Sequence, residues 1–352
     1  MRYVVCIPDG AADEPLEELG GRTPLEAAAM PNLARLAAAG EVGRASVIPA
    51  GMPPGSDVGN MAILGYDPAR YHTGRAPIEA AAMGIDLQPG QVAYRCNLVT
   101  LDDTSGTMVD FSAHHIATEL STPIIEAVDA ELGGGRDGIS FYPGVMYRHV
   151  MVAPAELGKA DCVPPHDLTG KSAILPDGPA AGALRRIMEA SKEIVRAKAA
   201  ELGADATQVW LWGQGTRPML PSFEARWGLS GRLVTAVDLI RGLGVLTGID
   251  PVEVPGATGY YDTDYEAKRD ACLASLADRP LFVIHVEASD EAGHNGEADR
   301  KVEALENWDR RIIGPLVGAL DDLGPWRLML MPDHATPSAH RTHTPHPVPN
   351  QI

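Results

Sequence analysis

Three short apolar runs in this 352-residue chain each end close to an aspartate, and this pattern constrains the fold more than any other feature. The runs are residues 3–7, 281–286 and 328–331. Short runs bounded by proline or glycine are typical of buried strands in a parallel sheet. Strand-like and helix-like patterns also alternate through most of the sequence. We therefore predict a wound α/β fold, with a mostly parallel sheet flanked by helices.

Carboxylate and imidazole side chains follow the three predicted strands. In open α/β sheets, ligands bind beyond the carboxyl ends of the strands, so these side chains can share one site. Three carboxylates and three imidazoles at one sheet edge would form a site for two divalent metal ions. The six predicted ligands are Asp9, Asp290, His294, Asp333, His334 and His343.

Each ligand assignment has a structural alternative. Asp9 lies in a Pro-Asp-Gly turn sequence, and Asp333 could form an Asx turn. Asp290 and His294 have i,i+4 spacing, which places them on one face of a helix but also suits a solvated ion pair. Their joint occurrence after three predicted strands favours the metal site. His285, inside the second apolar run, is interpreted as a core histidine.

Ser56 follows a Pro/Gly turn and precedes a stretch that can begin a helix. One interpretation is a helix N-cap, for which serine is a preferred residue. The other is functional, because a helix N-terminus favours an anion and a metal ion would help the hydroxyl become a nucleophile. Four arginines near predicted strand ends or turns are candidates for holding an anionic substrate. They are Arg75, Arg95, Arg148 and Arg217.

The composition limits the binding partners and the cellular compartment that we expect for this chain. The formal net charge of −18 argues against nucleic acid or an anionic membrane as a partner, and an anionic substrate would need local positive charge. The four cysteines form no CxxC pair, which indicates a reducing compartment. No apolar run approaches membrane-spanning length. We predict a cytoplasmic protein.

The region from residue 91 to residue 165 has a different pattern, with several β-like segments and two candidate helices. We predict that it is a smaller α+β domain inserted into the main one. Residues 1–90 and 166–352 would then form the metal-binding core domain.

Short motifs along nearly the whole chain resemble those of the archaeal-type, cofactor-independent phosphoglycerate mutases, in the alkaline phosphatase superfamily. The resemblance implies an alkaline phosphatase-like fold in which residues 91–165 are a cap that binds substrate. It also implies that the family's final segment is missing after residue 352. The matching motifs are PDG at 8–10, LGGRTPL at 19–25, PGSDV at 54–58, LGYDP at 64–68, TGRAP at 73–77, RCNL at 95–98, WGQG at 212–215, PGATG at 255–259, DEAGH at 290–294 and DH at 333–334.

The resemblance implies a division of the ligands between two divalent ions, with Mn²⁺ expected and Mg²⁺ or Zn²⁺ as alternatives. No 2,3-bisphosphoglycerate would be required. One ion would be bound by Asp9, Ser56, Asp333 and His334, and the other by Asp290, His294 and His343.

The resemblance also implies that Ser56 is the nucleophile. It would take the phosphoryl group from 3-phosphoglycerate and return it to the 2-hydroxyl, a step of glycolysis and gluconeogenesis. The substrate would be held by Arg75, Arg95, His115 and Arg148. Three alternatives stay open: a homoserine kinase-like phosphotransferase of the same family, a phosphomonoesterase in which water intercepts the phosphoserine, and a non-catalytic metabolite-binding protein.

Overall fold

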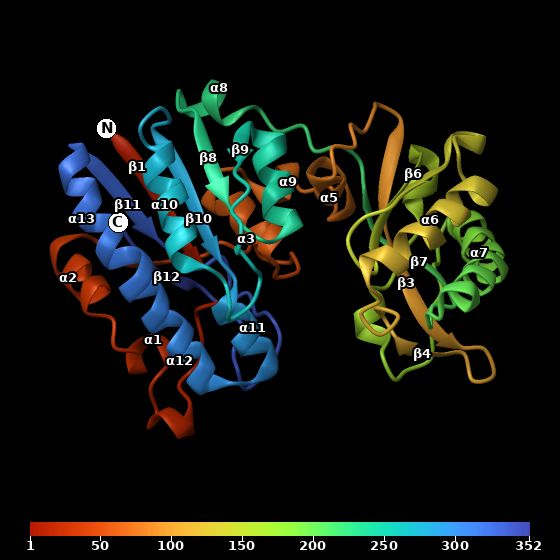
Figure 1. Ribbon diagram of the computed structural model, residues 1–352, viewed down its shortest axis with the longest axis horizontal. Helices are drawn as coiled ribbons and strands as arrows, with labels where there is room; N and C mark the ends of the chain where they lie inside the picture. The colour runs from red at the N-terminus through yellow and green to blue at the C-terminus, as the bar shows by residue number, and fades with distance from the viewer. The chain divides into compact units, whose positions relative to one another are not determined.

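The computed structural model describes residues 1–352, and the chain forms two compact units. Unit 1 combines Met1–His72 with Met219–Ile352, and unit 2 is Thr73–Pro218. Both units are drawn in Figure 1. None of the helices is both long and apolar enough to cross a membrane.

The sheet of unit 1 has seven strands in the order β2-β12-β11-β1-β10-β8-β9. The strands from β11 to β9 run parallel, whereas β12 is antiparallel to both of its neighbours. The wound, mostly parallel α/β prediction is therefore confirmed for this unit. The strands are β1 (Arg2–Pro8), β2 (Val42–Ala45), β8 (Gly231–Val234), β9 (Ile249–Pro251), β10 (Leu281–Val286), β11 (Trp326–Leu330) and β12 (Val348–Gln351).

The three predicted strands are β1, β10 and β11, and they are neighbours at the centre of the sheet. Cys6 of β1 pairs with Ile284 of β10 on one side and with Leu330 of β11 on the other. Because all three strands are parallel and in this register, their carboxyl ends meet at one edge of the sheet. This edge is where the polar residues after each strand gather.

Helices cover both faces of this sheet. On one face, Phe282 and Ile284 of β10 pack against Tyr265 of α10 and against Ile312 and Leu316. In Figure 1, α10, α12 and α13 lie in front of the strands. The helices of unit 1 are α1 (Pro24–Ala27), α2 (Pro31–Ala39), α3 (Ser56–Ile63), α4 (Pro68–Tyr71), α8 (Phe223–Trp227), α9 (Asp238–Thr247), α10 (Tyr265–Ser275), α11 (Ala288–Asn295), α12 (Ala298–Asn307) and α13 (Gly314–Leu323), with a π-helical turn at Trp308–Ile313 between the last two.

The second face holds α3 and the side chains of the alternate strand positions. Val58 of α3 belongs to a cluster with Met329 and Met331, whereas Leu328 and Leu330 face α10 and α13. This alternation follows from the two-residue period of a strand. It brings the N-terminus of α3 close to the polar residues that follow β11.

Unit 2 is built on an antiparallel sheet in which the long strand β3 is central. β3 pairs with β7 and β6 along most of its length and with β4 at its end, and β5 extends the sheet beyond β6. Helices α6 and α7 pack against the sheet through a shared apolar core (Figure 1). The elements are α5 (Ala76–Ala82), β3 (Gln91–Asp102), β4 (Thr107–Asp110), α6 (Thr118–Leu132), β5 (Ser140–Tyr142), β6 (Arg148–Pro154), α7 (Ala181–Leu202) and β7 (Gln208–Gly215).

Unit 2 extends beyond the predicted insert of residues 91–165 at both ends. The reason is strand pairing: β7 joins the same sheet as β3, with Asn97 opposite Trp210. Helix α7 packs on that sheet and α5 contacts it, so both belong to the same unit as the strands. Residues 73–90 and 166–218, which we expected in the core domain, are therefore part of unit 2.

Candidate active site

The first group of candidate ligands is Asp9, Asp333 and His334, which lie directly after β1 and β11. All three are buried, and one ligand atom of each lies within 4.8 Å of the others. His334 Nε2 is 3.2 Å from Asp9 Oδ1 and 3.7 Å from Asp333 Oδ2. The Asp333 carboxylate also accepts hydrogen bonds from Asn60 Nδ2 at 2.7 Å and from the Gly10 N–H at 3.2 Å. These contacts fix the orientation of Asp333.

The electrostatics of this first group suit a cation. Burial, followed by the negative charges of Asp333 and Asp290, raises the pKa of Asp9 well above its usual range. Burial lowers the pKa of His334, which favours the neutral imidazole that can act as a ligand. Asp9 Oδ1 and His285 Nε2 are buried without a hydrogen-bond partner. Two buried carboxylates side by side are costly unless a positive charge is added, so the residues fit a divalent metal ion.

The second group is Asp290, His294 and His343. Asp290 and His294 lie on α11, one turn apart as predicted, and His294 Nε2 is 3.3 Å from Asp290 Oδ2. His343 Nε2 is 3.4 Å from Asp290 Oδ1 and 2.9 Å from His294 Nε2. Two imidazole nitrogens and a carboxylate facing one point form a typical donor set for a divalent transition metal. The rings of His343 and His334 are 3.9 Å apart, so the two groups adjoin.

Ser56 lies beside the first group. It is the first residue of α3, and Gly55 before it is the N-cap, which makes no side-chain capping bond. The N-cap interpretation of Ser56 is therefore wrong. Its Oγ instead lies 3.2 Å from His334 Nε2, and the Asn60 side chain donates to the Ser56 carbonyl at 2.9 Å. The hydroxyl is thus held at a helix N-terminus next to the carboxylate-rich group.

His285 is a site residue that sequence reasoning missed. Its Nε2 is 3.4 Å from Asp9 Oδ2 and 3.8 Å from Asp333 Oδ2, and its Nδ1 is 3.2 Å from Glu287 Oε1. Burial opposes its charge, but the carboxylates of Asp333 and Glu287 outweigh this effect and raise the pKa of His285 to about 9. The fully buried Lys268 pairs with the same Glu287 at 2.7 Å. The sequence signal for this position is the two-residue period of a strand, which places the His285 side chain on the opposite face of β10 from Ile284.

The predicted substrate residues lie in unit 2, and two of them, Arg95 and Arg75, lie beside Trp212. The Arg95 guanidinium stacks 4.2 Å from the Trp212 ring centre, and that of Arg75 lies 5.9 Å from it. Arg95 is buried and pairs with Glu79 at 2.9 Å. Burial and the charges of Arg75 and Arg148 lower the pKa of Arg95, while Glu79 opposes them. Arg95 and Arg75 beside Trp212, with the charge of Arg148 also acting on Arg95, concentrate positive charge that suits an anionic ligand.

His115 reaches the same region through aromatic contacts. Its ring lies 6.0 Å from that of Tyr147 and 6.2 Å from that of Phe111, and Arg148 lies 5.2 Å from the Tyr147 ring centre. His166, which the sequence did not single out, lies 5.3 Å from Trp212. The remaining sequence candidate, Arg217, is half exposed and pairs with Asp86 instead.

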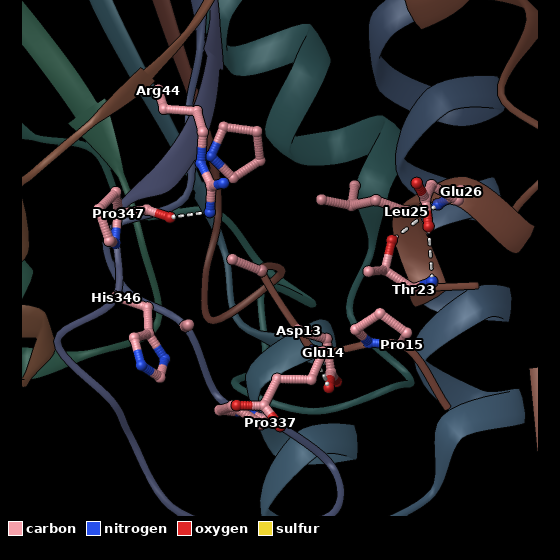
Figure 2. Close-up of a pocket in the computed structure, with 13 residues that line it drawn as sticks. Asp13, Glu14, Pro15, Thr23, Leu25, Glu26, Arg44, Pro337, His346 and Pro347 are labelled. Atoms are coloured by element: carbon pink, nitrogen blue, oxygen red, sulfur yellow. Dashed lines mark hydrogen bonds between the residues drawn. The ribbon is translucent and has the colours of Figure 1, made fainter. Parts of the chain in front are cut away.

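Unit 1 also has a hollow of about 610 Å³ (Figure 2). Arg44 points across it, and its guanidinium donates to the Pro347 carbonyl at 3.2 Å. The hollow is also lined by Asp13, Glu26 and His346, and it includes none of the candidate ligands or Ser56. The candidate ligands and Ser56 therefore lie at the sheet edge and not in the lining of this hollow.

Comparison with known proteins agrees with this geometry. Residues 37–200 match a family model described as 2,3-bisphosphoglycerate-independent phosphoglycerate mutase. The chain is 44% identical over 359 residues to a probable enzyme of that name from Geobacter sulfurreducens, covering 99% of this chain and 90% of that protein. It is 46% identical over 361 residues to the Methanothrix thermoacetophila enzyme of that name, covering 100% of this chain and 90% of that protein.

Solved structures show the same fold. The PH0037 protein from Pyrococcus horikoshii superposes with a TM-score of 0.83 at 28% identity, covering 100% of this chain and 87% of that one. The cofactor-independent phosphoglycerate mutase of Thermoplasma acidophilum superposes with a TM-score of 0.65 at 24% identity, covering 99% of this chain and 89% of that one.

Fold and site together define a wound α/β protein with two adjoining candidate ligand groups for divalent metal ions at the carboxyl edge of its parallel sheet. The chain belongs to the 2,3-bisphosphoglycerate-independent phosphoglycerate mutase family.

Proposed function

We propose that this chain is a metal-dependent phosphoglycerate mutase, which interconverts 3-phosphoglycerate and 2-phosphoglycerate through a phosphoserine at Ser56. The observation that carries the proposal is the position of Ser56 Oγ, 3.2 Å from His334 Nε2 and at the start of a helix. A nucleophile in this position lies near the backbone N–H groups of a helix N-terminus and near candidate metal ligands, and both would favour binding of a phosphoryl group.

We propose that the two ligand groups hold two divalent ions, with Mn²⁺ as the expected metal. Asp9, Asp333, His334 and Ser56 would hold one ion, and the group of Asp290 would hold the other. When bound, such ions neutralise charge on the transferred phosphoryl group and lower the pKa of a bound hydroxyl. The chain's own side chains would hold the two ions in place and would orient the Ser56 oxygen toward the phosphoryl group.

The proposed reaction consists of two phosphoryl transfers, one to Ser56 and one from it. In the first, the bond between phosphorus and O3 of the substrate breaks as the bond to Ser56 Oγ forms. The serine loses its proton and the glycerate O3 gains one, so the products of this step are glycerate and phosphoserine. In the second, the bond between phosphorus and Ser56 Oγ breaks as the bond to O2 of glycerate forms, and O2 loses a proton while the serine regains one. No net proton or phosphate is released.

The arginines of unit 2 would recognise the anionic groups of the substrate. Arg95 is the best placed, because Glu79 and the Trp212 ring hold its guanidinium. Arg75 and Arg148 add positive charge near it. A planar guanidinium can donate two parallel hydrogen bonds to a carboxylate or phosphate, which lysine cannot do. We propose that these side chains and His115 bind phosphoglycerate, and that the cell uses the reaction in glycolysis in the cytoplasm.

The test compares wild type, Ser56→Ala and Ser275→Ala in buffer containing Mn²⁺. Formation of 2-phosphoglycerate from 3-phosphoglycerate is followed by ³¹P NMR, and mass spectrometry of acid-quenched protein identifies the phosphorylated residue. Ser275 is a buried serine of α10 and is the matched control. We expect activity in wild type and Ser275→Ala, loss of at least about 1000-fold in Ser56→Ala, and phosphate only on Ser56.

Activity of Ser56→Ala equal to that of wild type would exclude the phosphoserine route. Release of inorganic phosphate by wild type without formation of the other isomer would support a phosphomonoesterase instead. Transfer of phosphate to homoserine, measured in parallel with ATP as donor, would favour the kinase-like alternative.

A further inference from the structure

The hydroxyl of Thr336 joins the two ligand groups. Thr336 is fully buried, two residues after His334 in the segment that follows β11. Its Oγ1 donates a hydrogen bond to Asp290 Oδ1 and lies 3.1 Å from His334 Nδ1. Asp290 belongs to one group and His334 to the other. This side chain is therefore the direct hydrogen-bonded link between ligands of both groups.

The direction of these hydrogen bonds follows from the proton count. A threonine hydroxyl has one proton, and a carboxylate that binds a metal ion can only accept. The hydroxyl proton therefore points to Asp290, so the contact with His334 must be a donation from Nδ1–H to Oγ1. With its proton on Nδ1, His334 keeps the lone pair of Nε2 free. That is the nitrogen that faces Ser56 Oγ and Asp9.

The position of Thr336 does not depend on its hydroxyl. Its backbone N–H donates to the Ala12 carbonyl at 3.1 Å, and its own carbonyl accepts from Lys301 Nζ at 2.8 Å. Lys301 is itself fully buried and held by Asp13 at 2.9 Å. A Cβ added to Gly293 would overlap the Thr336 backbone and Cγ2, so α11 packs directly against this residue. Removing the hydroxyl alone should therefore leave the backbone in place.

We propose that Thr336 is a positioning residue whose single hydroxyl orients ligands of both metal sites at once. The proposal rests on the proposed binding of two metal ions and adds a residue that would bind neither. It would act by holding the Nδ1–H form of His334 and the Oδ1 side of Asp290. Outer partners of this kind typically contribute about 10- to 100-fold to metal affinity.

The experiment compares Thr336→Val, which keeps the shape and removes the hydroxyl, with Thr336→Ser, which keeps the hydroxyl. Metal-free protein is titrated with Mn²⁺ by calorimetry, and bound metal is counted by mass spectrometry after gel filtration. We expect two ions in wild type and in Thr336→Ser. In Thr336→Val we expect both dissociation constants to rise by about tenfold or more. Circular dichroism establishes that each variant is folded.

Unchanged dissociation constants in Thr336→Val, or a rise at only one of the two sites, would overturn the proposal. Wild type that binds no ions would instead contradict the proposed metal-dependent function. A measurement on wild type covers the case in which Thr336→Val does not fold. Histidine ¹⁵N NMR should show His334 with its proton on Nδ1, and a proton on Nε2 would also overturn the proposal.

Discussion

Replacing Lys268 by methionine should reveal how strongly unit 1 depends on one buried ion pair. Lys268 Nζ is fully buried and donates to Glu287 Oε2 at 2.7 Å and to the His285 carbonyl at 2.9 Å. Glu287 also accepts from the Ala236 N–H at 2.8 Å and from the Thr235 hydroxyl at 3.1 Å. Methionine fills a similar space but has no charge and no donor. The variant would leave a buried carboxylate without its main countercharge.

The magnitude follows from the titration of Glu287. Burial raises the pKa of Glu287, but the charge of Lys268, together with His285, outweighs this effect and lowers the pKa from 4.5 to about 2. At neutral pH this difference corresponds to roughly 3 kcal/mol of stability. Breaking a buried ion pair typically costs about 3–5 kcal/mol. We therefore expect Lys268→Met to lower the free energy of unfolding by about 3 kcal/mol at pH 7.

The dependence on pH has a defined sign. Because the pKa of Glu287 is lower in the folded than in the unfolded state, its contribution is complete above about pH 4.5 and is lost as the pH falls toward about 2. Methionine at position 268 removes most of this contribution. The difference in stability between wild type and Lys268→Met should therefore shrink as the pH falls through that window.

The assay is urea unfolding followed by circular dichroism at pH 7 and at about pH 3.5, within the window where Glu287 titrates. Arg300→Met, which breaks the exposed pair of Arg300 with Glu303, is the matched control and should cost less than about 1 kcal/mol. The double variant Lys268→Met/Glu287→Gln should regain most of the loss, because no unpaired charge remains buried. A loss below about 1 kcal/mol in Lys268→Met, or a double variant no more stable than the single one, would refute the reasoning.

Three further predictions concern the site. Gly10→Ala should weaken metal binding at least about tenfold in a calorimetric titration, because Gly10 has a φ of +61° and an added Cβ would overlap the Asp290 side chain. Arg95→Lys should raise KM for 3-phosphoglycerate by about tenfold or more and leave the Mn²⁺ dissociation constants unchanged, because lysine loses the fork and the stacking on Trp212. Adding Mn²⁺ to metal-free protein at about 100 times its dissociation constant should raise the free energy of unfolding by about 2.7 kcal/mol per site, as measured by urea unfolding. An unchanged urea midpoint would contradict binding of Mn²⁺ to the folded state.

Much of the fold was predictable because parallel strands are buried on both faces and appear as short continuous apolar runs. The predicted run at 281–286 coincides with β10, the run at 3–7 lies within β1, and the run at 328–331 covers the last three residues of β11 and one residue beyond it. The rule that ligands gather at the carboxyl ends of such strands then brought Asp9, Asp290 and Asp333 together. Where the pattern was short and mixed, it failed. The pattern of residues 233–241 would suit one short helix, but this stretch contains the end of β8 and the start of α9.

The residues that support the site were not predictable, because their roles depend on tertiary contacts. His285 looked like a core residue, and in the structure it is fully buried, but its ring faces two carboxylates from other segments. Thr336 has no distinctive sequence context, and only the fold brings its hydroxyl to Asp290. The borders of unit 2 were missed for a similar reason. The pairing of β3 with β7 joins residues more than 100 positions apart, and no local pattern specifies such a pairing.

The distribution of lysines gives a physical reason for metal dependence in an acidic protein. Unit 1 contains only two lysines, and both are fully buried in ion pairs, Lys268 with Glu287 and Lys301 with Asp13. Neither can meet a phosphoryl group at Ser56. The carboxylates around that serine would repel such a group unless divalent cations reversed the local charge. The same carboxylates that make the sheet edge unfavourable for an anion thus make it favourable for metal ions, and anion binding at Ser56 should vanish with the metal.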